Sequence, residues 1–184
     1  RVFREKEKEL TREEYEKLLA GAQQQGSARL ALLLETICAT GVRVSEVQYI
    51  TVEAARRGRV DVTMKGKIRT ILIPNKLCRK LLKYAKQTKT ASGKIFLTRN
   101  GTALSRKQIW AEMKSLCQAA GVSPGKVFPH NLRHLFAMVF YRTSRDIVKL
   151  ADLLGHSSIE TTRIYLISTG AEHARTLDRL RLIS

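Results

Sequence analysis

The chain has 184 residues, 43% hydrophobic and 27% charged, which predicts one globular domain with a proper core rather than two ordinary domains. No apolar run approaches the roughly 20 residues that span a bilayer, so no membrane partner is expected. The N-terminus has neither an apolar signal core nor an initiating Met, which indicates a fragment or a processed chain.

The formal net charge of +18 predicts a polyanionic partner, and nucleic acid is the default for so large a basic excess. Six of the sixteen acidic residues fall within the first sixteen positions, so the remainder is more basic still. Membrane-surface and ribosomal proteins are alternatives, but those often carry basic tails, whereas this charge is spread through ordered-looking segments. Neutralising several phosphates makes binding strongly salt-dependent.

Three cysteines, Cys38, Cys78 and Cys117, lie far apart in apolar helical patterns. An odd number at such spacings fits neither a disulfide framework nor a zinc site, and the sequence predicts no metal or other cofactor. We expect three buried thiols in a reducing cytoplasm.

Helical periodicity dominates the chain, and the main β-rich runs lie together around residue 65. From the N-terminus, the patterns predict a charged arm over 1–9, a helix over 11–25 opened by a Thr11–Glu14 capping box, a buried helix ending at Gly41 and a helix from Ser45. Strands over 59–64 and 68–73 follow, then a helix over 75–88 and a short strand over 95–97. The C-terminal half is predicted to contain a helix over 105–120 that buries Trp110, and further helices that open at Phe128, span 146–154, begin after Ser157 and span 171–183. The predicted fold class is mainly α with one small antiparallel sheet (α+β).

Arg43 lies between apolar neighbours at a helix junction. An unpaired buried guanidinium is costly, so Arg43 needs a partner. Glu46 is one candidate and a phosphate, which the planar guanidinium binds bidentately, is the other. Both hold if Glu46 positions the arginine.

A tight hairpin at Lys65-Gly66-Lys67 joins the two predicted strands. A lysine at such a tip usually keeps an exposed sheet edge soluble. A hairpin tip also reaches away from the body, and could deliver an ammonium group into a cleft.

Two further candidate pairs lie in the C-terminal half. His130 and Arg133 are three residues apart, so they share a face of the helix that opens at Phe128. His156 precedes a helix start at Ser157, where a capping box with Glu160 is expected and where free N–H groups attract phosphate; Tyr165 lies about two turns along. The simpler interpretation makes His156 a cap and Tyr165 a half-buried core aromatic.

Together these residues form a complete set for metal-free phosphoryl transfer. Two arginines with histidine donors can stabilise charge on a phosphodiester. A tyrosine hydroxyl can form a covalent phosphoester, and a lysine can protonate the leaving hydroxyl. No cluster of carboxylates is present to hold Mg²⁺, so the pattern does not favour a two-metal nuclease.

Three segments, 40–46 (TGVRVSE), 130–134 (HNLRH) and 153–156 (LLGH) continuing to Tyr165, resemble the catalytic domain of the tyrosine recombinases, the phage-integrase and Xer-like family. The likeness runs from about residue 10 to the C-terminus, and the hairpin lysine lies between the first two segments as expected. It implies a fold of the tyrosine recombinase and type IB topoisomerase kind. Residues 10–184 would form the catalytic domain, and 1–9 would be the linker from a core-binding domain.

The resemblance also implies a role for each candidate. Tyr165 would attack the scissile phosphate to give a 3′-phosphotyrosyl enzyme, while Arg43, Arg133 and His156 hold the nonbridging oxygens. Lys65 would be the general acid, with Lys67 as the competing candidate, and His130 would assist proton transfer or bind the phosphate. His134 matches a position that is structural rather than catalytic.

The resemblance further implies double-stranded DNA as partner and self-association, as a tetramer on DNA, through the C-terminal helix with Leu177 and Leu180 as contacts. The expected function is site-specific recombination for mobile-element integration or excision, in the cytoplasm at the nucleoid. Type IB topoisomerase-like relaxation, chromosome-dimer resolution and a non-catalytic DNA-binding module are the alternatives. We also expect the helix that carries Tyr165 to be the mobile part of the site.

Overall fold

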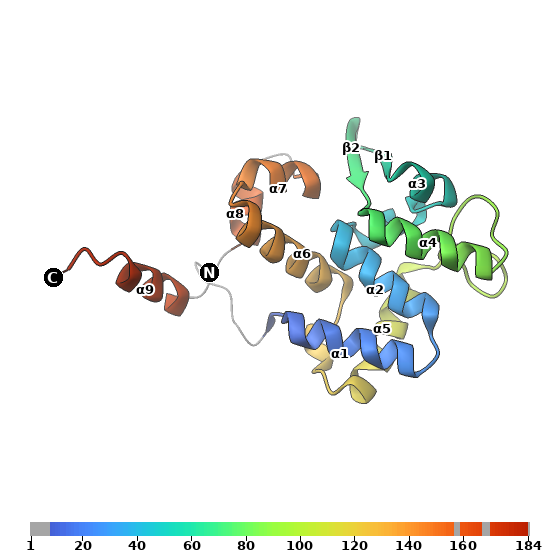
Figure 1. Cartoon of the computed structure of the whole chain (residues 1–184), viewed down its shortest axis with the longest axis horizontal. Helices are drawn as coiled ribbons and strands as arrows, with labels where there is room; N and C mark the ends of the chain where they lie inside the picture. The colour runs from blue at the N-terminus through green and yellow to red at the C-terminus, as the bar shows by residue number, and fades with distance from the viewer. Residues whose placement is uncertain (1–7, 157–158, 167–169, 184) are drawn as a thin grey trace.

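The computed structural model describes residues 8–156, 159–166 and 170–183, which form helices around one small hairpin (Figure 1). The elements are α1 (Arg12–Gln24), α2 (Ala28–Thr40), η2 (Val44–Tyr49), α3 (Val52–Arg57), β1 (Arg59–Met64), β2 (Lys67–Leu72), α4 (Asn75–Gln87), α5 (Arg106–Ala120), η3 (Pro124–Lys126), α6 (Pro129–Ser144), α7 (Ile147–Leu154), α8 (Ile159–Tyr165) and α9 (Gly170–Arg179). The predicted fold class, mainly α with one antiparallel sheet, is confirmed.

Helix α2 is the centre of the core because its residues are apolar on nearly every face. It packs against α1, α4 and α6, and Figure 1 shows it lying between these three helices. Helix α1 begins at the predicted capping box, in which Thr11 and Glu14 each accept a hydrogen bond from the other's backbone N–H. The helices over 75–88, 105–120 and 146–154 also form close to their predicted bounds, as α4, α5 and α7.

The hairpin has a two-residue turn. Lys65 and Gly66 both have positive φ, 50° and 78°, as a type I′ turn requires, and Met64 pairs with Lys67. Lys67 therefore opens β2, one residue earlier than predicted. A non-glycine residue with positive φ costs free energy, and such residues concentrate at functional sites.

Several elements of the structure differ from the predicted ones, and most of these elements are short. The helix expected from Ser45 is a 3₁₀ helix that begins at Val44, and the six-residue α3 after it was not predicted. In place of the strand expected over 95–97, the described residues have one isolated bridge, between Leu97 and Ala103. The last helix ends at Arg179, not at residue 183.

The predicted burial of Trp110 is wrong, because its side chain is 38% exposed. Ile109, Met113, Leu116 and Cys117 of the same helix are buried as expected. Trp110 follows the apolar periodicity, yet it lies at the edge of the buried face.

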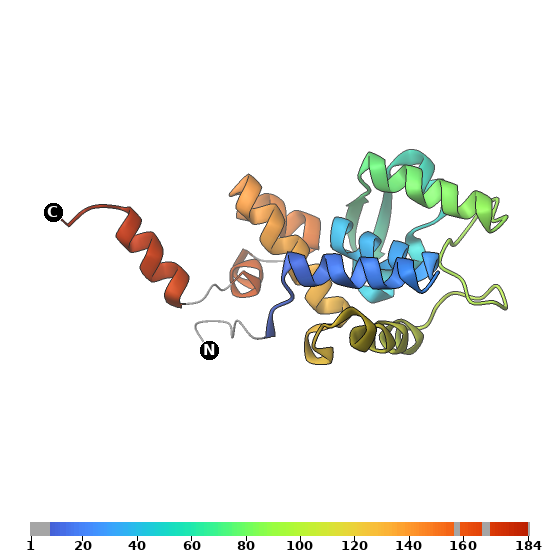
Figure 2. The same cartoon turned by 60° about the horizontal axis from the view of Figure 1, so that its bottom comes forward.

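The C-terminal helices form a second, smaller apolar cluster built on Ala137, Leu150 and Leu154. Helix α7 packs against α6, α8 and β2. Helix α9 stands apart from this body in both views (Figures 1 and 2). No helix among the described residues is long and apolar enough to cross a membrane.

The end of α2 is fixed by close packing at Gly41. Gly41 caps the helix with φ +71°, and a Cβ built there would lie 2.6 Å from Cδ2 of Phe136 on α6. Only glycine both adopts this backbone conformation cheaply and admits the phenyl ring.

We therefore expect Gly41→Ala to lower the free energy of unfolding by about 3 kcal/mol, combining left-handed strain with a steric clash. Gly121→Ala is the matched control, because Gly121 caps α5 with the same φ but has open space around its Cβ position. That variant should lose only about 1 kcal/mol. Urea unfolding measures both, and equal losses would contradict a close contact at Gly41.

Candidate active site

A cleft of about 690 Å³ brings together four of the six residues that the sequence singled out. These are Arg43, His130, Arg133 and His156, which come from three places far apart in the chain. Other lining residues are Val42, Val44, Arg106, Trp110, Pro129 and Thr161. The cleft therefore combines two guanidinium groups and two imidazoles from the predicted set with a third guanidinium, a favourable environment for a phosphate.

Arg43 is held by Glu46, as one of the two sequence alternatives proposed. It is the cap residue of η2, and its backbone N–H donates to Oε1 of Glu46 at 2.8 Å. Its NH1 lies 3.7 Å from Oε2 of the same carboxylate. Glu46 is 1% exposed whereas the Arg43 side chain is 32% exposed. Because Glu46 holds the arginine from within the fold, the guanidinium still borders the cleft.

Arg133 is buried and fixed by two carbonyl groups. Its NH1 donates to the carbonyl of Gly41 at the end of α2, and its NH2 donates to the carbonyl of Leu154 at the end of α7, each at 2.5 Å. These bonds set the plane of the guanidinium. His130, one helical turn earlier on α6, is exposed and lines the same cleft, as the three-residue spacing predicted.

His156 lies just after the end of α7, and its Nδ1 is 2.8 Å from Oγ1 of the buried Thr162. Burial, followed by the positive charges of Arg133, Arg43 and Arg69 and by His130, lowers the pKa of His156 to about 4. The imidazole is therefore neutral at physiological pH. If Thr162 donates to Nδ1, Nε2 carries the proton and can donate to a phosphate oxygen.

The two candidate lysines lie differently. Both are exposed, but Lys65 lies in the hairpin turn, whereas Lys67 lines a second pocket of about 540 Å³ together with Arg69, Gly155 and His156. Since His156 lines both pockets, the hairpin lies beside the cleft that holds the arginines. This arrangement leaves both lysines as candidates.

Tyr165 is the last residue of α8, and its side chain lies outside the described part of the structure, so its distance from the arginines stays a prediction. Ser157, the first member of the predicted capping box, also lies outside the described residues. Glu160, the second member, pairs with Arg163, with Oε1 2.7 Å from NH2.

Helix α5 adds residues that sequence reasoning did not assign to the site. Arg106 and Trp110 line the cleft, Trp110 stacks on Phe128 with ring centroids 5.7 Å apart, and Lys114 Nζ lies 5.4 Å from the Trp110 ring. Helix N-termini favour acidic residues, yet α5 opens with Arg106 and Lys107. That contrary charge was the available signal for an anionic partner.

Comparison with known sequences supports the family that the residues of the cleft resemble. The model of the phage integrase family matches residues 8–172. Tyrosine recombinase XerA of Pyrococcus furiosus is 32% identical over 183 residues, covering 96% of this chain and 63% of that protein. Tyrosine recombinase XerC of Neisseria gonorrhoeae is 40% identical over 139 residues, covering 72% of this chain and 45% of that protein.

Solved structures share the fold. The crystal structure of XerA recombinase superposes with a TM-score of 0.77 at 23% identity, over 96% of this chain and 64% of that one. A lambda integrase tetramer bound to a Holliday junction gives a TM-score of 0.69 at 23% identity, over 85% and 47%.

The chain spans roughly half to two thirds of the length of the curated relatives it matches. The family match itself extends over most of the chain, from the first described residues to the start of α9. The chain thus belongs to the phage integrase family.

Proposed function

We propose that this chain is the catalytic domain of a site-specific DNA recombinase that cuts and rejoins strands through a 3′-phosphotyrosyl intermediate, without metal or ATP. The observation that carries this proposal is the convergence of Arg43, His130, Arg133 and His156 on one cleft. Three chain segments contribute these groups, and a phosphate is the ligand that best satisfies them.

In the proposed reaction the Tyr165 hydroxyl gives its proton to His130, its oxygen attacks the scissile phosphorus, and the bond from phosphorus to the 5′-oxygen breaks. Arg43 and Arg133 stabilise the charge on the nonbridging oxygens, and His156 donates a hydrogen bond as a neutral imidazole. Lys65 protonates the departing 5′-oxygen. A 5′-hydroxyl of another strand then attacks the phosphotyrosine and releases Tyr165. The covalent link conserves the phosphodiester, so no nucleotide cofactor is consumed.

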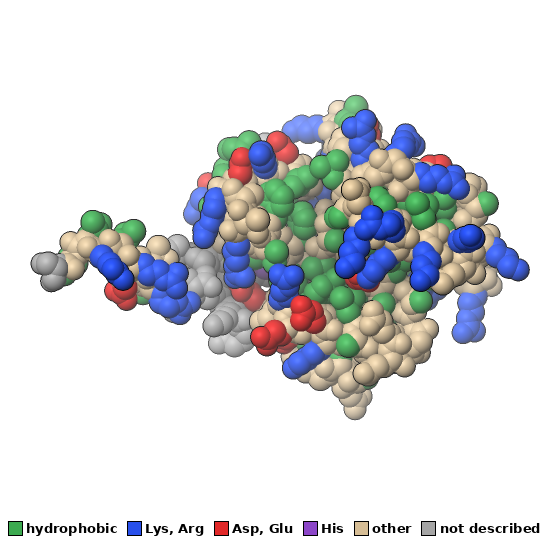
Figure 3. Space-filling view, viewed as in Figure 1, with side chains coloured by type: hydrophobic (Ala, Val, Ile, Leu, Met, Phe, Trp, Pro, Cys, Tyr) green, Lys and Arg blue, Asp and Glu red, His purple; other side chains and the backbone are tan. Residues whose placement is uncertain are grey.

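Double-stranded DNA is the proposed partner. On the face drawn in Figure 3, Lys and Arg side chains are spread over the body and over α9, in keeping with the net charge of +18. One structure of similar fold is the XerH recombinase bound to its difH substrate, with a TM-score of 0.73 at 24% identity. Mobile-element integration or excision stays our expectation from the sequence, and the Xer relatives support chromosome-dimer resolution as the second candidate role.

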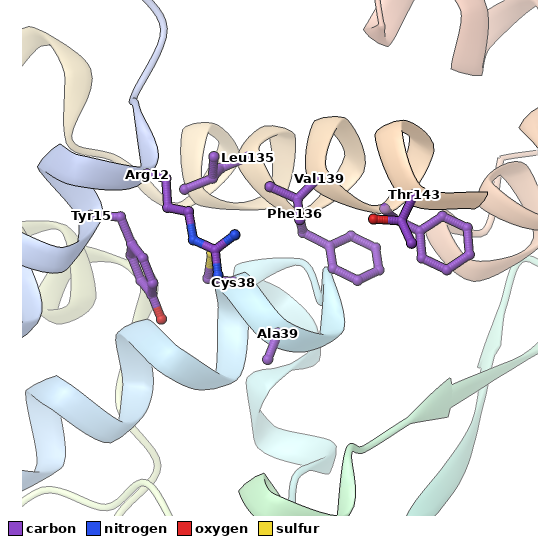
Figure 4. A pocket seen from close by; sticks show the side chains of 9 residues that line it. Arg12, Tyr15, Cys38, Ala39, Leu135, Phe136, Val139 and Thr143 are labelled. Atoms are coloured by element: carbon purple, nitrogen blue, oxygen red, sulfur yellow. The ribbon is translucent and has the colours of Figure 1, made fainter. Parts of the chain in front are cut away.

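We further propose that copies associate on DNA, as a tetramer, by docking α9 into a neighbouring copy. Leu177 of α9 and Leu180, which follows the last residue of that helix, are 67% and 53% exposed. An apolar pocket of about 410 Å³ between α1, α2 and α6 offers a matching surface (Figure 4). It is lined by Arg12, Tyr15, Cys38, Ala39, Leu135, Phe136, Val139, Phe140 and Thr143. Burial raises the pKa of the Cys38 thiol to about 12, so this thiol adds no charge to the pocket at neutral pH.

Removal of the proposed nucleophile tests the chemistry. We expect Tyr165→Phe to abolish covalent adducts on a nicked suicide substrate while DNA affinity changes less than about twofold, because only the reacting oxygen is lost. Denaturing gels detect the adduct, and filter binding measures affinity. Adducts formed by the Phe variant would mean that another residue is the nucleophile. Wild-type chain that relaxes DNA but never exchanges strands between two sites would favour the topoisomerase-like activity.

The general acid is tested with leaving groups. We expect Lys65→Ala to slow single-turnover cleavage by about 100-fold or more, and a 5′-thiol leaving group to restore most of the rate because it needs no proton. Lys67→Ala is the matched control, two residues away on the same hairpin. A slow, thiol-rescued Lys67 variant beside a normal Lys65 variant would move the role to Lys67.

The docking of α9 is tested by changing its apolar face. We expect Leu177→Gln combined with Leu180→Gln to weaken assembly on two-site DNA by about tenfold or more, since each leucine loses roughly 1.5–3 kcal/mol of burial. Leu182→Gln serves as control, because Leu182 lies three residues beyond the end of the helix, whereas the backbone N–H of Leu180 still donates to the carbonyl of Thr176 in the last turn. Analytical ultracentrifugation on DNA measures assembly, and an unchanged double variant would exclude α9 as the contact.

A further inference from the structure

A buried arginine outside the predicted set forms hydrogen bonds to two of the segments that supply residues to the candidate site. We propose that Arg69 is a positioning residue that fixes the hairpin lysine against the phosphate-binding cleft. The inference rests on the proposed cleavage reaction. It names a residue that holds the reacting groups in place without touching the reacting atoms.

Arg69 joins the hairpin to α7 through directed hydrogen bonds. It lies on β2, and its side chain is 8% exposed. Its Nε donates to the carbonyl of Leu153 at 3.0 Å, and its NH1 donates to Oε2 of Glu46. One planar guanidinium thus links a strand, the last turn of α7 and a helix cap. A lysine has no such fork, so it cannot reproduce both bonds in one geometry.

The carboxylate that Arg69 binds is the one that orients Arg43. Glu46 accepts the Arg43 backbone N–H through Oε1, and its Oε2 lies 3.7 Å from Arg43 NH1. Arg43 and Arg69 therefore flank a single buried anion. A shift of Arg69 would be transmitted to Arg43 through this shared partner.

The turn before His156 closes directly on the Arg69 side chain. Gly155 has φ +73°, and a Cβ built there would lie 2.4 Å from Cδ of Arg69 and 3.0 Å from its Nε. Glycine is needed at this position because the arginine stem occupies the space of a side chain. His156 is the next residue, so its backbone is placed against Arg69.

The hairpin transmits this anchorage to the lysine. Arg69 is paired with Val62 across the sheet, and the ladder continues without a bulge to Met64 and Lys67 at the turn. Lys65 follows Met64 directly. Because a two-residue turn adds little freedom, the position of the tip depends on where Arg69 holds the strand.

Arg69 is not itself placed as a phosphate ligand. It lines the pocket beside the cleft rather than the cleft that contains Arg43 and Arg133. Its NH2 is buried and has no hydrogen-bond partner among the described residues. An unsatisfied buried donor costs free energy, and native folds tolerate such groups mainly where function requires the residue.

The kinetic test compares variants on the suicide substrate. Arg69→Gln and Arg69→Lys should each slow single-turnover cleavage by about 10- to 100-fold, with DNA affinity within about threefold of wild type, because small displacements of reacting groups have effects of this size. Arg59→Gln is the matched control, an exposed arginine on the paired strand. Should the Gln variant fail to fold, as judged by circular dichroism, the Lys variant carries the test.

A double-variant cycle separates positioning from general destabilisation. In a Lys65→Ala background, Arg69→Lys should slow cleavage by a clearly smaller factor than in the wild-type background, because one of the groups that Arg69 positions is already gone. Multiplication of the two single losses would overturn the inference. So would a cleavage rate for Arg69→Lys equal to that of Arg59→Gln.

His156 provides a readout that does not depend on cleavage. The positive charge of Arg69 helps to lower the pKa of His156. In an NMR titration, Arg69→Gln should therefore raise that pKa toward its usual value, whereas Arg69→Lys, which keeps a charge, should raise it less. An unchanged pKa in Arg69→Gln would overturn the placement of Arg69 beside His156. Wild-type chain that forms no adduct would overturn the proposed function instead, and the titration would still report on Arg69.

Discussion

One buried carboxylate allows the cationic site to exist. Glu46 is almost fully enclosed, and it binds Arg69 and the backbone of Arg43 while lying close to the Arg43 guanidinium. Guanidinium groups gathered in one place repel each other, and burying any of them without an anion is costly. Because the carboxylate lies inside the fold, it compensates this charge without occupying the cleft.

The ends of helices supply the second half of this compensation. The carbonyl groups at the ends of α2 and α7 have no partner within their own helices, and they carry the negative end of the helix dipole. Arg133 binds one carbonyl from each helix, and Arg69 binds another from α7. The cleft therefore forms where two helix C-termini meet the start of α6. The close packing of Gly41 against Phe136 holds the end of α2 against α6.

Local signals in the sequence were sufficient for the long elements and insufficient for the site. A capping box located the start of α1, and periodicity located α5, because a cap and a four-turn pattern involve only neighbouring residues. The six-residue α3 was missed because it is too short to show a period. Trp110 was placed in the core because periodicity defines a face, not which neighbour covers it.

The candidate site needed information of a different kind. The predicted residues of the cleft are separated by up to 113 positions, and no local pattern shows that such segments meet; resemblance to a known family suggested it. Four of the six candidates share the cleft, while the side chain of Tyr165 lies outside the described residues and the choice between Lys65 and Lys67 is open. Arg69 escaped notice because an arginine on a hairpin usually faces solvent, and only the tertiary pairing with Glu46 reveals its burial.

The neutral His156 in a ring of positive charges has a thermodynamic consequence. A cleft whose cations outnumber its internal anion is more stable when a polyanion supplies the missing charge, and any ligand that binds only the folded state stabilises it by mass action. Folding and the occupancy of the cleft by an anion are thus linked. The low pKa of His156 also makes the free energy of unfolding depend on pH. Between about pH 4 and 6.5 this histidine binds a proton in the unfolded chain but not in the folded cleft. Acidification through that interval therefore favours the unfolded chain. An anion bound in the cleft reduces this destabilisation, because it stabilises the protonated imidazole in the folded state.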